Sequence, residues 1–349
     1  MADIKASVLG DITDPKVRKV LQPIIQQAQL GAEKVAAHHH QPKGFLMPKD
    51  PKTLEGILQT RFAELPEQVK SKAANNALAS LAQPASARAS RVGELAKVNL
   101  ASAEPIEAQM KRIAFPKVKL TIDELAKAVH AEAKVAAIAA KAYKQVELRL
   151  HRVRCADETN GWFGSEAGSD EISLGGSEVD ESGDTYKIKP FKVASFDDGD
   201  VKTYAPPRRF CFFNLGEGTK FPKSYFVTFV LAEVDMGGLP EFIDKLYNWV
   251  KEKVITALTA ALGAAIGASG GPVGAIIGAI VGWAVGKVYE IFKAIWQDEV
   301  FPPKTVRLDV PSATHRFPGG AIDSTEQTVE FKGHGGTYEL RYDWRLFDK

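Results

Sequence analysis

The sequence predicts an α+β protein in which a helical part precedes a strand-rich part. Residues 1–143 are rich in alanine, contain several helix-start signals and place apolar side chains at helical spacing. From Gln145 onward, apolar and polar residues alternate in short runs separated by Gly, Pro and Asp, a pattern typical of strands. A long segment without charged residues, 254–286, lies between two of these runs and has helical character.

Helix-start signals place the elements of the first part. Asp14-Pro15 and Asp50-Pro51 each combine a capping side chain with proline at the first helical position, and Thr121 with Glu124 forms a capping box. These signals and the apolar spacing predict helices over residues 15–37, 52–64, 66–82, 84–98, 104–114 and 122–143. We expect them to form one all-α domain, residues 1–143.

Alternating runs place the strands of the second part. They cover residues 145–151, 186–193, 208–215, 225–233, 305–310, 327–332 and 337–346. Gly333-His334-Gly335-Gly336 joins the last two runs and predicts a hairpin turn. Six or seven strands with such turns predict an antiparallel β-sandwich over residues 144–349. The helical segment 239–298 interrupts this domain and is predicted to be an inserted helical hairpin.

Glycines recur four residues apart in the charge-free segment. One series is Gly263, Gly267 and Gly271, and the other is Gly274, Gly278, Gly282 and Gly286. Residues i and i+4 share a helix face, so each series predicts a stripe without side chains that allows close backbone approach, as between membrane helices. The breakers in Ser269-Gly270-Gly271-Pro272 divide the segment into two antiparallel helices.

Three interpretations of this hairpin stay open on the sequence alone. It is a permanently buried core element, an element sheltered in a soluble form that later enters a bilayer, or an ordinary two-helix membrane anchor. Each charge-free arm is shorter than the roughly 20 residues that span a bilayer core, so spanning requires the amphipathic flanks. Trp249, Trp283 and Trp296 are placed to act as interface anchors.

Charge, cysteine content and the N-terminal residues bear on nucleic-acid binding, disulfide formation and secretion. The first 143 residues carry 21 basic and 14 acidic side chains, but without aromatic interleaving or a dense Arg cluster we expect no nucleic-acid partner. Cys155 and Cys211 are too few for a disulfide framework; they either pair across neighbouring strands or remain reduced core thiols. The N-terminus lacks an apolar signal region, so any delivery to a target membrane is expected to use a non-Sec route.

Acidic loops form the second candidate site. Asp197, Asp198 and Asp200 are the best candidates for a calcium site. Asp157, Asp180 and Asp184 are candidate partners for that site. The alternative, which the sequence favours, is a plain turn whose carboxylates cap backbone amides. No other cofactor is expected.

Catalytic motifs are missing from the sequence. It contains no Gly-x-Ser-x-Gly elbow, Walker-type loop, His-Glu-x-x-His or Cys-x-x-Cys motif, and its histidines outside 38–40 are scattered. The sequence therefore predicts a protein that is not an enzyme.

The segment LTAALGAAIGASGGPVGAIIGAIVGWAVGKV resembles the glycine-zipper hairpins of bacterial membrane-active and pore-forming toxins. The plan of helices followed by strands is similar to that of several two-domain toxins. The resemblance implies a soluble form that shelters the hairpin, then inserts it into a lipid bilayer or engages a cell-surface receptor and forms a homo-oligomer on the membrane. The chain departs from colicin-type toxins because its hairpin lies within a β-domain. The alternative function is a non-enzymatic binding or structural module with a permanently buried hairpin.

Overall fold

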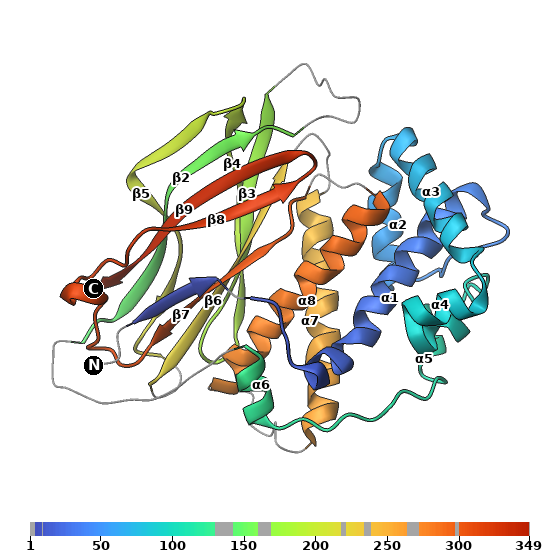
Figure 1. Ribbon diagram of the computed structural model, residues 1–349, viewed down its shortest axis with the longest axis horizontal. Helices are drawn as coiled ribbons and strands as arrows, with labels where there is room; N and C mark the ends of the chain where they lie inside the picture. Colours follow the sequence, from blue (N-terminus) through green and yellow to red (C-terminus); the bar gives the residue numbers. More distant parts are fainter. Residues whose placement is uncertain are drawn as a thin grey trace.

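A computed structural model describes residues 4–8, 10–129, 142–159, 169–217, 221–233, 239–263, 272–296 and 300–348. The fold is α+β with two antiparallel sheets, and the predicted plan of N-terminal helices followed by strands is confirmed (Figure 1). The first part contains α1 (Pro15–His40), α2 (Leu54–Glu64), α3 (Glu67–Leu81), α4 (Ala85–Val92), the 3-10 helix η1 (Gly93–Lys97), α5 (Ile106–Met110) and α6 (Ile122–Ala128).

The caps show why these helices begin where they do. Asp14 Oδ1 accepts hydrogen bonds from the backbone N–H of Lys16 (2.8 Å) and Val17 (2.9 Å), which confirms the predicted start of α1. The predicted capping box of Thr121 and Glu124 is also present. The predicted start at Asp50-Pro51 is wrong, because Asp50 forms a turn whose carbonyl accepts from Thr53, and Thr53 is the cap of α2. The predicted helix from residue 122 is described only to Ala128; residues 130–141 lie outside the described part.

Nine strands of the described chain form two sheets. They are β1 (Lys5–Val8), β2 (Gln145–Asp157), β3 (Asp170–Val179), β4 (Thr185–Phe196), β5 (Val201–Asn214), β6 (Lys223–Glu233), β7 (Lys304–Val310), β8 (Gln327–Gly333) and β9 (Gly336–Phe347). One sheet has the order β1-β7-β6-β3-β4, and the other has the order β5-β2-β9-β8. The β8–β9 turn follows the prediction, with positive φ angles at His334 (55°) and Gly335 (82°).

Two strands were not predicted from the sequence. β1 lies in the part predicted to be entirely helical, and it pairs with the edge of β7 from Lys5 opposite Asp309 to Val8 opposite Val306. Four residues are too few to show a period, so only the exposed edge of β7 identifies them as a strand. β3 contains Gly175-Gly176 and acidic residues, which obscured its alternation.

The inward faces of both sheets form one buried cluster. Its members include Leu148 of β2, Leu174 of β3, Phe229 of β6 and Trp344 of β9, all fully buried. Cys155 and Cys211 lie among them as free, buried thiols, so the alternative of reduced core cysteines is the one observed.

A second cluster joins the N-terminal helices to α7 (Leu239–Leu262) and α8 (Pro272–Trp296). These two helices fall between β6 and β7 in the chain, and α8 lies between α1 and the outer face of the five-stranded sheet (Figure 1). Val179 and Phe226 extend the cluster onto that outer face. Residues on both sides of position 143 therefore share one core. None of the helices, over the residues described, is both long and apolar enough to cross a membrane.

Candidate functional site

The glycine series of α8 faces the five-stranded sheet. A Cβ atom added at Gly274 lies 2.1 Å from the carbonyl oxygen of Ser182, and one added at Gly278 lies 2.2 Å from Cγ1 of Val179. A Cβ at Gly282 lies 2.9 Å from Oγ1 of Thr305. Real Cβ atoms do not approach other heavy atoms this closely, so three successive glycines allow the helix backbone to rest on the sheet.

Gly286, the fourth glycine of this series, and the glycines of the other series make no such close contact in the part of the chain that the structure describes. A Cβ at Gly286 meets only the carbonyl oxygen of Pro303, at an ordinary 3.9 Å. Gly263 is exposed, has a φ of +66° and follows the last residue of α7, where only glycine is unstrained. Gly267 and Gly271 lie outside the described residues. Gly274, Gly278 and Gly282 of α8 thus serve helix-to-sheet packing in this conformation, whereas Gly286 does not.

The candidate tryptophan anchors have separate environments. Trp249 on α7 is only 6% exposed and belongs to the cluster shared with the N-terminal helices. Trp283 on α8 is half-buried, and its Nε1–H donates to Oδ1 of Asp11 at 2.6 Å. This hydrogen bond is the largest cause of the lowered pKa of Asp11. The side chain of Trp296 lies outside the described part.

Some of the acidic residues lie together at one end of the sheets, where the loop after β2 meets the loop between β4 and β5. Asp198 Oδ1 accepts from the backbone N–H of Glu158 at 2.7 Å, and Asp200 Oδ2 accepts from the backbone N–H of Asp197 at 3.0 Å. Burial, followed by the charge of Asp198 and of neighbouring carboxylates, including Asp157, raises the pKa of Glu158.

Two candidate calcium partners, Asp180 and Asp184, are distant from the turn that contains Asp197, Asp198 and Asp200. Asp180 and Asp184 form the β3–β4 turn, at the opposite end of β3 from Asp170. Asp198 and Asp200 instead accept hydrogen bonds from backbone amides, so they act as caps of the turn. Within the described ranges, no group of three or more His, Cys, Asp or Glu side chains is arranged as a metal site. Calcium binding stays a prediction.

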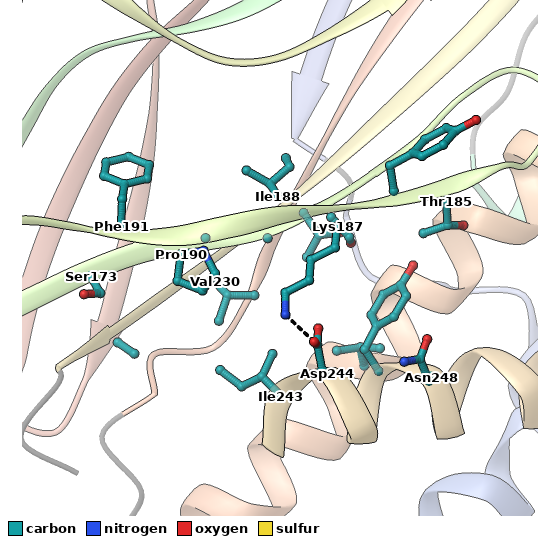
Figure 2. Close-up of a pocket in the computed structure, with 18 of the residues that line it drawn as sticks. Ser173, Thr185, Lys187, Ile188, Pro190, Phe191, Val230, Ile243, Asp244 and Asn248 are labelled. Carbon is teal, nitrogen blue, oxygen red and sulfur yellow. Dashed lines mark hydrogen bonds and ion pairs between the residues drawn. The ribbon is translucent and has the colours of Figure 1, made fainter. Parts of the chain in front are cut away.

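A pocket of about 400 Å³ lies between the outer face of the sheet and α7 (Figure 2). Its floor comes from small and apolar residues of β3 and β6, including Ser173, Gly175, Val230 and Ala232. The opposite wall is one face of α7. Residues of that wall are Ile243, Asp244, Tyr247, Asn248 and Lys251, spaced three or four apart as helix geometry requires.

One ion pair bridges the pocket. Figure 2 shows the side chain of Lys187 reaching from β4 to Asp244 on α7, with which it forms an ion pair, while Ile188 and Phe191 project to the other side of β4. Burial raises the pKa of Tyr247, and its side-chain hydrogen bonding with Ser177 and Thr185 opposes that rise. The pocket therefore combines an apolar interior with a few fixed polar groups, as small-molecule sites do.

No sequence motif identified this pocket. Its lining is spread over β3, β4, β6, α7 and α8, which only the tertiary structure brings together. One local signal was present: Ser173, Gly175 and Ser177 leave one face of a strand with very small side chains. Such a face indicates close approach by another group or an uncovered space.

Glu178 is a half-buried titratable group outside this pocket, on the inner face of β3 beside Cys211. Burial raises the pKa of this carboxyl to about 7. The folded protein therefore holds a proton that the unfolded chain loses near pH 4.3. The stability that depends on a protonated Glu178 is fully present below that pH and is lost as the pH rises through about 7.

We expect Glu178→Gln to stabilise the protein at pH 8 relative to the native chain, by about 1–2 kcal/mol after allowance for partial solvent screening. At pH 4 the two proteins differ little, because both side chains are neutral. Urea unfolding at both pH values measures the difference, and an equal effect at pH 4 and pH 8 would contradict the assignment. Glu171→Gln is the control, since Glu171 is an exposed carboxylate on the same strand.

Comparison with protein-family models, with curated proteins and with solved structures finds no match.

Proposed function

We propose that this chain is a non-enzymatic ligand-binding module in which α7 and α8 are a permanently buried layer. The close fit of α8 to the sheet supports this proposal most directly. Gly274, Gly278 and Gly282 lie where any larger residue meets the sheet, so the glycine spacing has a structural explanation in the folded chain. The pocket beside α7 supplies the binding site.

We further interpret the two sheets as the layers of an antiparallel β-sandwich into which the α7–α8 hairpin is inserted. The shared inward cluster of the sheets and the position of α7 and α8 between β6 and β7 support this interpretation. In this arrangement the sandwich and α1 hold α8 from opposite sides. The division into domains at residue 143 stays a prediction.

A melting experiment tests the binding function. We expect at least one class of apolar small molecule to raise the melting temperature, because a ligand at 100 times its Kd stabilises the folded state by about 2.7 kcal/mol. Ser173→Phe places a large ring on the pocket floor and is expected to abolish the shift. Thr328→Phe is the control, on a strand of the other sheet. Equal shifts in native protein and Ser173→Phe would place the binding elsewhere.

A membrane-active effector is the second candidate function. It is favoured by the separation of the two buried clusters: as far as the side chains are described, the core shared by the sheets contains no residue of α7 or α8. Release of the hairpin into a bilayer would thus leave that core closed. Its partners would be a lipid bilayer or a cell-surface receptor, with self-association on the membrane. Dye release from anionic vesicles at neutral and acidic pH tests it, and absence of leakage under both conditions removes it.

A further inference from the structure

We infer that the pocket between β4 and α7 binds a single-chain amphiphile with an anionic head group. This inference rests on the proposed binding function and adds the chemical class of the ligand. It follows from three features of the pocket: an apolar interior, an excess of lysines among its lining residues, and one lysine to which no described residue is a partner.

The interior suits a hydrocarbon chain. Val230 and Ala232 of β6, Pro190 of β4, Ile243 of α7 and Val285 of α8 enclose it from three sides. Gly175 adds no side chain to the floor, and Pro190 of β4 packs directly against it, with its Cα 3.0 Å from the position that a Cβ would occupy. Burial of apolar surface contributes affinity in proportion to the area removed from water, so a flexible chain laid along this floor binds without specific polar contacts.

The charge of the lining favours an anion. Lys187, Lys192 and Lys251 line the pocket, whereas Asp244 is the one carboxylate among the lining residues that the structure describes. Asp244 is already engaged by Lys187. Lys192 forms an ion pair with Glu171 at 2.8 Å, outside the lining. The described lining of the pocket thus has no carboxylate left for the third lysine.

Lys251 is the group that receives the head. Across the residues that the structure describes, its ammonium makes no hydrogen bond or ion pair, although the residue is half-buried. A cation that is partly removed from water is stabilised by an anion at its side. Lys251 lies one turn beyond Tyr247 on the same face of α7, so a head group at Lys251 leaves the chain directed over Val230.

Charge reversal of this lysine tests the inference. The probes are dodecanoate, dodecanol and dodecyltrimethylammonium, each below its micelle concentration, and the readout is titration calorimetry. We expect the native protein to bind dodecanoate about tenfold more tightly than dodecyltrimethylammonium, a difference of about 1.4 kcal/mol. Lys251→Glu is expected to reverse this order. Lys189→Glu, at an exposed β4 lysine outside the lining, is expected to leave it unchanged.

The possible outcomes distinguish a failure of this inference from a failure of the proposed ligand-binding function. Equal binding of the three probes, unaffected by Lys251→Glu, overturns the anionic head group and leaves an apolar binding module. Binding of dodecanoate that survives Ser173→Phe overturns the location. If none of the probes binds and no apolar compound shifts the melting temperature, both the inference and the proposed function fail.

Discussion

Gly278→Ala is expected to lower the free energy of unfolding by about 1–3 kcal/mol, the usual cost of overpacking a well-packed contact. The new methyl group lies 2.2 Å from Cγ1 and 2.9 Å from Cβ of Val179, so rotation of the valine alone does not relieve the overlap. The helix must move from the sheet. In an exposed helix the same change adds about 0.5–1 kcal/mol of stability, so a net loss identifies the close contact. Thermal and urea unfolding measure it.

Gly286→Ala is the matched control on the same helix and in the same glycine series. Its added methyl group has 3.9 Å to the nearest atom, so we expect unchanged or slightly raised stability. Val179→Ala removes the opposing methyl groups, and the double variant Gly278→Ala with Val179→Ala is expected to lose less than the two single losses together. If Gly278→Ala is as stable as Gly286→Ala, then α8 does not rest on the sheet and the main support for permanent burial is lost.

Lys223→Met is expected to destabilise the protein by about 3–5 kcal/mol, the largest effect predicted for a single side chain. Lys223 and Glu181 are each 3% exposed, and their Nζ and Oε1 atoms lie 3.1 Å apart. The ammonium also donates to the carbonyl oxygen of Leu215 at 2.9 Å and to that of Glu217. Methionine keeps the length of the stem but leaves the Glu181 carboxylate buried without a cation. Urea unfolding measures the loss.

Two further variants show whether the loss arises from an unpaired buried charge. Lys223→Met with Glu181→Gln removes both charges and is expected to recover part of the stability, a coupling visible in a double-mutant cycle. Lys332→Met breaks an exposed pair with Glu330 and is expected to cost at most about 1 kcal/mol. Equal losses of stability for Lys223→Met and Lys332→Met would mean that burial adds nothing to the contribution of the Lys223–Glu181 pair.

Local chemistry explains which parts of the fold were predictable. Asp14 caps α1 and Thr121 with Glu124 caps α6, because a cap depends on residues within one turn of each other. The turn at His334-Gly335 was predictable for the same reason. Asp50 misled because a proline at the next position suits a turn as well as a helix start, and the following Thr53 is the actual cap.

Non-local contacts explain the rest. β1 exists because β7 presents an unpaired edge more than 290 residues later in the chain, which no window of the sequence contains. The pocket likewise needs β4 and α7 to stand side by side, joined by Lys187 and Asp244. Neither residue is unusual in its own segment.

The amino-acid sequence alone determined the α+β class, the general plan of helices followed by strands, and the presence of a glycine face on the second apolar helix. The tertiary structure alone decided that this face meets Ser182, Val179 and Thr305 of the sheet region and not the neighbouring helix. The physical reason is that periodicity encodes which side chains share a face, whereas the surface opposite that face is set by contacts between distant segments.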